Sequence, residues 1–128
     1  MAKFSWEHIH LRTPDPEATA QWYEKMLEAK VIRTSMPDGA TRIDLDLHGQ
    51  KVFIAPAHAK AQTAEPPKQP YFGLEHIGLT VDNIDQAVTE LKRKGVEFTM
   101  EPTTVRPGVR ISFLRAPQNV SIELIQRG

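Results

Sequence analysis

Apolar and polar residues alternate along several short stretches of the chain. Because successive side chains of a β-strand point to opposite faces, this alternation predicts strands with one buried face. Turns rich in Pro, Gly, Asn and Asp separate the stretches. We expect strands within residues 5–13, 30–34, 41–49, 51–56, 74–81, 96–100, 109–115 and 120–126.

Two longer stretches carry apolar residues at helical spacing. The first follows Asp15, a favourable N-cap, and Pro16, which suits the first helical position. The second begins after Asp82 or Asn83 and ends at Gly95. The apolar faces are Ala20, Tyr23 and Leu27 in the first helix, and Ile84, Ala87, Val88 and Leu91 in the second.

The sequence contains an internal repeat. Glu7-His8-Ile9 recurs as Glu75-His76-Ile77, and a strand, a helix and three further strands follow the same order in each copy. The segment between the copies has no apolar period and is rich in Ala, Pro, Gln and Lys, which is typical of a linker. We predict one α+β domain over 1–128, with βαβββ modules at 1–56 and 71–128 and a linker at 57–70.

The polar side chains of the strands gather on one predicted face. The helices must pack on the apolar face of the sheet, so alternation sends the remaining side chains to the opposite face. Contact with water is the usual reason for such a pattern. A solvated face is typically rich in Lys, Glu and Thr, however, whereas histidines with carboxylates are ligands for divalent metals. The residues of this face are His8, His10, Asp44, Asp46, His48, His76, Arg110, Ser112 and Glu123.

The composition argues against several classes of function. The 16 basic and 16 acidic side chains give a formal net charge of zero, which disfavours a general nucleic-acid or membrane-surface binder. No apolar run approaches the length of a transmembrane helix, and the N-terminal residues lack a signal-peptide pattern, so we expect a cytoplasmic location. The absence of cysteine excludes disulfides, thiolate zinc sites and a cysteine nucleophile.

The two Glu-His-Ile strands and the closing strand SIELIQ resemble those of the vicinal oxygen chelate superfamily. This group includes glyoxalase I, extradiol dioxygenases, methylmalonyl-CoA epimerase, and fosfomycin- and bleomycin-resistance proteins. The resemblance spans nearly the whole chain. It implies that two βαβββ modules form a curved mixed sheet around a metal cleft, with the helices on the outer face.

The resemblance also implies a ligand set. Carried over residue by residue, it indicates His8, His76 and Glu123 as metal ligands. The family's fourth ligand place falls at Ile54 or a neighbour, and isoleucine cannot bind a metal. The remaining triad leaves positions free for substrate oxygens and suits one Fe²⁺, Mn²⁺, Ni²⁺, Co²⁺ or Zn²⁺ ion. His10 has Gly78 as its counterpart in the second copy, so the repeat favours His8 as the ligand.

The other polar residues of this face are candidates for substrate chemistry. A metal that chelates two vicinal oxygens stabilises the negative charge that develops when a neighbouring C–H proton leaves. An arginine could hold a substrate carboxylate or phosphate by paired hydrogen bonds, although surface ion pairing is an alternative for Arg110, Asp44 and Asp46. The candidate catalytic residues are Asp44, Asp46 and His10, and the candidate substrate-binding residues are Arg110, His48 and Ser112.

With the resemblance, these residues imply a metal-dependent lyase or isomerase acting on a small substrate with vicinal oxygens, and a homodimer is the default expectation for this family. Three alternatives stay open. An extradiol dioxygenase shares the triad, but Phe113 stands where that class usually has a tyrosine. A fosfomycin-type thiol transferase shares it too, but that class has a threonine at the place of His10. A metal-free binding or resistance protein of the same fold usually loses the three ligands. The sequence leaves open whether the cleft forms within one chain or between two.

Overall fold

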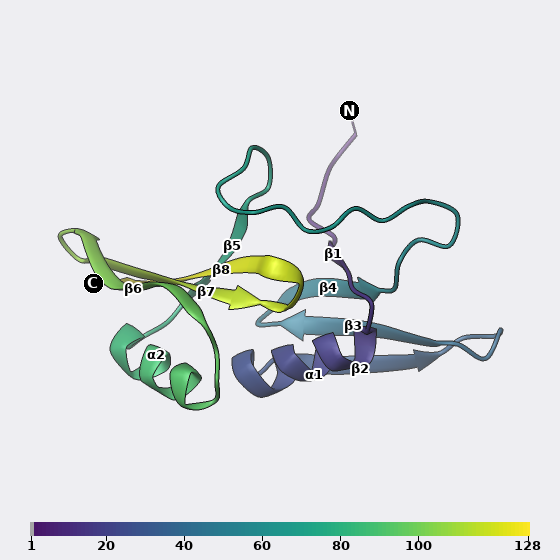
Figure 1. The fold of residues 1–128 in the computed structure, drawn as a ribbon, viewed down its shortest axis with the longest axis horizontal. Coiled ribbons are helices and arrows are strands. Elements are labelled where there is room, and N and C mark those ends of the chain that lie inside the picture. The colour runs from purple at the N-terminus through teal and green to yellow at the C-terminus, as the bar shows by residue number, and fades with distance from the viewer. Residues whose placement is uncertain (1) are drawn as a thin grey trace. The chain divides into compact units, whose positions relative to one another are not determined.

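The helices and strands occur in the order that the repeat predicts (Figure 1). The computed structural model describes residues 2–128. The first module consists of β1 (Ile9–Arg12), α1 (Pro16–Leu27), β2 (Lys30–Ser35), β3 (Thr41–Leu47) and β4 (Gln50–Ala55). The second consists of β5 (His76–Thr80), α2 (Ile84–Arg93), β6 (Phe98–Arg106), β7 (Val109–Ala116), the 3₁₀ turn η1 (Pro117–Asn119) and β8 (Val120–Arg127). The α+β class and the two βαβββ modules are therefore confirmed.

Each module folds around its own four-stranded mixed sheet. The strand order is β1-β4-β3-β2 in the first sheet and β5-β8-β7-β6 in the second. In both sheets the first strand of the module pairs in parallel with the last, and the other neighbours are antiparallel. The two strands that carry the predicted ligands of a module are thus direct neighbours.

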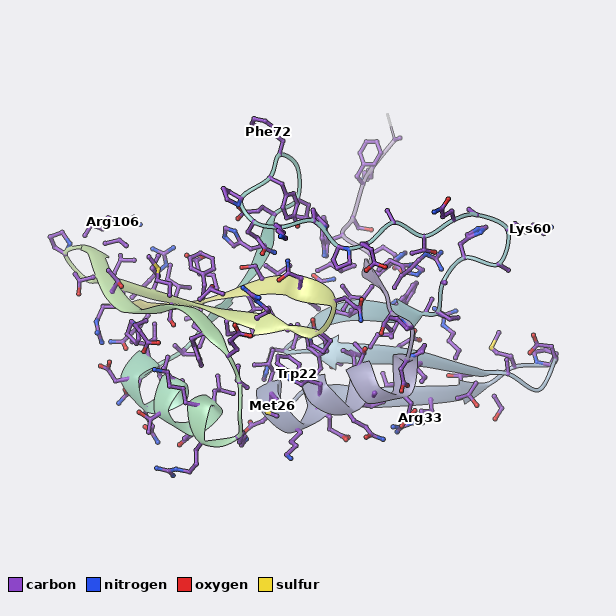
Figure 2. All side chains as sticks on the ribbon, in the orientation of Figure 1. Trp22, Met26, Arg33, Lys60, Phe72 and Arg106 are labelled. Carbon is purple, nitrogen blue, oxygen red and sulfur yellow. The ribbon has the colours of Figure 1, made fainter. Side chains whose placement is uncertain are left out.

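The chain forms two compact units, of which one ends at Ala64 and the other spans Glu65–Gly128. Residues 56–75, which connect β4 to β5, contain no helix or strand. Phe72 in this connection is fully exposed, as Figure 2 shows. No helix in the described part of the chain has the length and apolar character needed to cross a membrane.

The helices begin where the cap residues predict. The Asp15 carboxylate accepts a hydrogen bond from the N–H of Ala18 at 3.0 Å, and the Asn83 side chain accepts one from the N–H of Gln86 at 3.0 Å. Gly95 follows α2 with a φ of 95°, a left-handed conformation that glycine adopts without a steric penalty.

One face of each sheet packs on the helix of its module. The buried alternation predicted for β3 is confirmed, because Ile43, Leu45 and Leu47 lie in the core while the residues between them do not. The buried residues include Ala20, Tyr23, Leu27, Ile43, Leu45, Leu47, Val52 and Ile54 in the first module, and Ile84, Val88, Leu91, Leu114, Ile122 and Leu124 in the second.

The orientation predicted for β7 is wrong. The alternation places Ser112 and Arg110 on the face away from α2. Instead, Ser112 is fully buried and its hydroxyl donates to the carbonyl of Met100 at 2.7 Å. The guanidinium of Arg110 pairs with Asp85 of α2 at 2.5 Å. Apolar residues occupy both alternating sets of this strand, so the pattern alone does not decide which set faces the helix.

Candidate functional site

His76 and Glu123 lie side by side in the second module. His76 begins β5 and Glu123 lies in the middle of β8, the strand paired with it. The Nε2 of His76 is 3.6 Å from the Oε1 of Glu123, and both side chains are partly exposed, at 35% and 21%. The structure thus brings together two of the three predicted ligands.

Glu75 orients the imidazole of His76. Its Oε1 lies 2.8 Å from the Nδ1 of His76. A carboxylate accepts hydrogen bonds, so Nδ1 donates to Glu75 and Nε2 is the ring nitrogen on the side of Glu123. A carboxylate that fixes the second nitrogen in this way is characteristic of histidines that bind metals.

Gly78 keeps the surroundings of the Glu123 carboxylate open. The two residues are register partners on β5 and β8. A Cβ at Gly78 would lie 3.5 Å from the Oε1 of Glu123, so any longer side chain there would cover the carboxylate. On the other side of β8, Phe113 is the register partner of Glu123, and its ring meets the His76 ring edge-on at a centroid distance of 5.0 Å. The chemistry and the free space of this pair fit a divalent metal ion.

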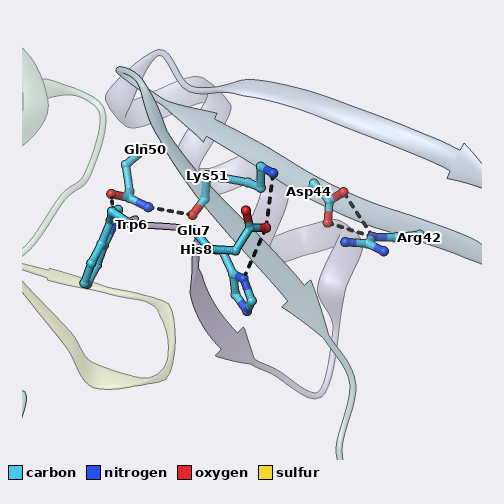
Figure 3. A network of polar contacts seen from close by, with 7 residues as sticks. All are labelled: Trp6, Glu7, His8, Arg42, Asp44, Gln50 and Lys51. Atoms are coloured by element: carbon cyan, nitrogen blue, oxygen red, sulfur yellow. Dashed lines mark hydrogen bonds and ion pairs between the residues drawn. The ribbon is translucent and has the colours of Figure 1, made fainter. Parts of the chain in front are cut away.

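His8 occupies the corresponding place in the first module, just before β1. Its Nδ1 lies 3.6 Å from the Oε1 of Glu7, which also accepts a hydrogen bond from the Nζ of Lys51 at 3.2 Å (Figure 3). The bond from Lys51 is the main reason why the pKa of the Glu7 carboxyl lies below its ordinary value. The His8 ring stacks on Phe53 of β4, with centroids 3.9 Å apart.

The sheet register identifies Phe53 as the counterpart of Glu123. Ile9 of β1 pairs with Val52, and its repeat equivalent Ile77 pairs with Ile122. The next residue along the closing strand is Phe53 in the first module and Glu123 in the second. Phe53 therefore stands where the resemblance would put the family's fourth ligand, if Glu123 is a ligand. Ile54, the first residue suggested by the sequence, is buried toward the helix. Neither side chain can bind a metal.

Asp44 supplies a carboxylate to the same face from the neighbouring strand. It is the register partner of Phe53, as Phe113 is the partner of Glu123. Each module therefore has one carboxylate and one phenylalanine at this pair of positions. The carboxylate lies on the third strand of the first module but on the closing strand of the second module. The Asp44 carboxylate accepts from the Nε of Arg42 at 3.1 and 3.2 Å, as Figure 3 shows. The Arg42 guanidinium carbon lies 4.4 Å from the centroid of the Phe53 ring.

His10 lies near His8 in the first module. It is the register partner of Phe53, and the centroids of the two histidine rings are 6.3 Å apart. Partial burial, together with the positive charges of Arg12 and His8, lowers the pKa of His10 below its ordinary value. His10 is therefore neutral near pH 7 and able to accept a proton.

Asp46 and His48 hold the turn between β3 and β4. The Asp46 carboxylate accepts from the N–H of Gly49 at 2.7 Å. The Nε2 of His48 lies 2.6 Å from the carbonyl oxygen of Leu27, so it donates to the end of α1. Both side chains are thus engaged in local structure and do not join His8 and His10.

Sequence reasoning did not include two aromatic residues and one arginine of the ligand-bearing faces among the site residues. Phe53 and Phe113 contact His8 and His76, and Arg115 lies on the same face of β7 as Phe113. The register of the two copies would have revealed the first two, because each stands opposite a carboxylate. Within residues 2–128, no set of three or more His, Cys, Asp or Glu side chains gathers as a metal site.

Two βαβββ modules, each with a histidine at the head of a strand that is paired with the closing strand, define a vicinal oxygen chelate fold. The model of the Glyoxalase/Bleomycin resistance protein/Dioxygenase superfamily matches residues 5–124. The chain belongs to this superfamily.

Alignments with individual proteins are consistent with membership of this superfamily. The uncharacterized protein YwkD of Bacillus subtilis (strain 168) is 30% identical over 128 residues, which cover 96% of this chain and 97% of the relative. Lactoylglutathione lyase of Escherichia coli O157:H7 is 27% identical over 121 residues, covering 93% and 90%. The crystal structure of the fosfomycin resistance protein FosX from Listeria monocytogenes aligns with a TM-score of 0.69 at 18% identity, covering 97% of this chain and 93% of FosX, which is a likeness of fold.

Proposed function

We propose that this chain is a metal-dependent lyase or isomerase that acts on a small substrate with two vicinal oxygens. His8, His76 and Glu123 are the proposed ligands of one divalent ion. The observation that carries the proposal is the His76–Glu123 pair, with Nε2 and Oε1 3.6 Å apart and Glu75 on the second ring nitrogen. This donor set suits Fe²⁺, Mn²⁺, Ni²⁺, Co²⁺ or Zn²⁺.

A divalent ion held by these residues would supply a Lewis acid for the substrate oxygens. His10 and Asp44 are the proposed proton-transfer residues. Both face away from the helix of their module, whereas Asp46 and His48 are committed to the β3–β4 turn. His10 is the stronger candidate, because both oxygens of Asp44 already accept hydrogen bonds from Arg42.

The relatives support a lyase and suggest a first substrate. The Escherichia coli relative is named a lactoylglutathione lyase. We therefore expect the metal-loaded protein to form lactoylglutathione, a thioester of a 2-hydroxy acid, from its isomer, the hemithioacetal of glutathione and the matching 2-oxoaldehyde. The proton that leaves one carbon returns to its neighbour, so no co-reactant is needed. Removal of the metal with a chelator should abolish turnover, and His10→Gln should lower it by about 10²-fold or more without releasing the metal.

Metal titration of the metal-free protein by calorimetry tests the ligand assignment. We expect His76→Ala to abolish binding of Mn²⁺ or Ni²⁺, because it removes a ligand that Glu75 holds in place. His10→Ala is the matched control on the equivalent strand and should spare most of the affinity. Equal losses in both variants would show that the ligands are assigned wrongly.

A ring-cleaving dioxygenase is the alternative that is simplest to test. Phe113 contacts His76 but carries no hydroxyl group, which argues against the tyrosine-dependent chemistry of that class. Cleavage of catechol gives a coloured product. An absorbance scan of the Fe²⁺-loaded protein with catechol should therefore show no new band, and a coloured product would favour the dioxygenase.

A further inference from the structure

A small polar cavity lies in the compact unit Glu65–Gly128. Its volume is about 140 Å³, and five of its six lining residues are polar. An apolar cavity of about 150 Å³ admits benzene, so this space can hold a small chemical group. The lining residues are Gln69, Thr99, Leu114, Arg115, Asn119 and Ser121.

The cavity lies on the ligand-bearing face of the sheet. Ser121 of β8 is the register partner of His76 on one side and of Arg115 on the other. Register partners point to the same face, so these three side chains form one row across the sheet. Because neighbouring strands are about 4.8 Å apart, Arg115 lies roughly 10 Å from His76.

Two hydrogen bonds hold the lining residues that come from outside the strands. The Gln69 side-chain amide donates to the carbonyl of Asn119 at 2.8 Å, and the Asn119 amide donates to the carbonyl of Pro67 at 2.8 Å. The connection before β5 is thereby fastened to the turn before β8. These two segments and strands β6, β7 and β8 line the cavity, so all of its lining residues lie within Glu65–Gly128.

The charge of the cavity favours a singly charged oxyanion. Arg115 brings one guanidinium group, whose closest carboxylate, from Glu97, is 3.9 Å away and beyond hydrogen-bonding distance. The hydroxyl groups of Thr99 and Ser121 add neutral donors. One positive charge balances a carboxylate, whereas Glu97 disfavours the second charge of a phosphate.

We propose that this cavity is a subsite for a carboxylate group of the substrate, bound by the fork of Arg115. The inference rests on the proposed function, because it places the carboxylate roughly 10 Å from His76 and so deepens the description of the substrate. It predicts an acid whose carboxylate is separated by several bonds from its vicinal oxygens.

Binding of succinate to the metal-free protein tests the subsite without any contribution from a metal. The chain is stripped with a chelator, which is then removed, and succinate is titrated by calorimetry. Arg115→Gln should raise the Kd at least about tenfold, because it removes a charge-assisted pair. The Kd of Arg115→Lys for succinate should lie between those of the wild type and Arg115→Gln, because lysine keeps the positive charge but cannot form the paired hydrogen bonds of a guanidinium. Ser121→Ala, which keeps the arginine, should weaken binding by a smaller factor.

Arg106→Gln is the matched control. It removes the same charge from the same module. Arg106 lies at the opposite end of β6 from Thr99, and Figure 2 shows it at the tip of a hairpin. Its succinate affinity should equal that of the wild type. Inorganic phosphate should bind the wild type more weakly than succinate, and tighter binding of phosphate would contradict the carboxylate assignment.

The outcomes separate this inference from the proposed function. If the wild type binds no succinate, or if Arg115→Gln binds it as the wild type does, the cavity is not a carboxylate subsite. Metal affinity should be the same in Arg115→Gln and the wild type. A wild type that takes up no metal but binds succinate through Arg115 would overturn the proposed function and leave the subsite intact.

Discussion

At the scale of single residues, the two Glu-His pairs of the repeat are alike in sequence but differ in their contacts. Glu75 holds the Nδ1 of His76 at 2.8 Å, whereas Glu7 is 3.6 Å from the Nδ1 of His8 and is shared with Lys51. The sequence predicts which histidines matter, because the motif recurs. It does not predict the role of Lys51, because that contact depends on the pairing of β1 with β4.

Tyr23 offers a test of the core at the same scale. It is 1% exposed, and its hydroxyl has no hydrogen-bond partner among the described residues. Replacing it by phenylalanine removes an unsatisfied polar group, so Tyr23→Phe should raise the free energy of unfolding by about 1 kcal/mol. Urea denaturation near neutral pH measures this change. A less stable variant would mean that the hydroxyl is satisfied in solution.

The same tyrosine predicts a loss of stability in alkali. Burial raises the pKa of Tyr23 above its ordinary value of 10.0, because the ionised form is disfavoured in the core. Its contribution is fully present below that ordinary value and is lost as the pH rises through it. The wild type should therefore lose more stability than Tyr23→Phe when unfolding is measured above the ordinary tyrosine pKa.

At the scale of elements, periodicity and the repeat predict the order of strands and helices along the chain and the helix caps, but not the order of the strands within each sheet. They do not predict the orientation of β7, because both of its alternating sets contain apolar residues. Only the pairing with β8 shows that Phe113 lies opposite Glu123. The same register shows that Phe53 of β4 is the equivalent of Glu123, a match that alignment of the strands by sequence leaves uncertain by one residue.

Phe53→Glu tests this register. It puts a carboxylate at the place equivalent to Glu123, and an added charged ligand should raise the metal affinity on the order of tenfold or more. Ile54→Glu is the control, because Ile54 is 5% exposed. That substitution should instead destabilise the fold by about 3 kcal/mol or more, since it buries a charge. A gain in metal affinity for Ile54→Glu but not for Phe53→Glu would contradict the register.

The contact between α1 and β2 predicts a sensitivity to acid. The Arg33 guanidinium pairs with Glu17 and lowers the pKa of that carboxyl below its ordinary value of 4.5. This ion pair contributes to stability above that value and is lost as the pH falls below it. The free energy of unfolding of Arg33→Gln should therefore fall less steeply than that of the wild type as the pH is lowered below this value. An equal fall in both proteins would show that water screens the pair completely.

At the scale of the whole molecule, the duplicated sequence exposes matched apolar side chains before each histidine strand. Phe4 and Phe72 are 96% and 105% exposed, and Trp6 and Leu74 are 75% and 77% exposed. Large apolar groups in such number favour contact with another molecule. We expect a homodimer, with a mass by light scattering of twice the 14.5 kDa of the chain. Phe72→Ser combined with Leu74→Ser should shift it toward monomer, and a monomeric wild type would refute this prediction.

The central claim is that His76 and Glu123 bind a divalent metal, and metal analysis of the protein purified without a chelator tests it most directly. We predict one divalent ion per chain in the wild type and none in Glu123→Gln, which keeps the size of the side chain but removes its charge. If the wild type contains no metal, and adding Fe²⁺, Mn²⁺, Ni²⁺, Co²⁺ or Zn²⁺ leaves its melting temperature unchanged, the claim is wrong.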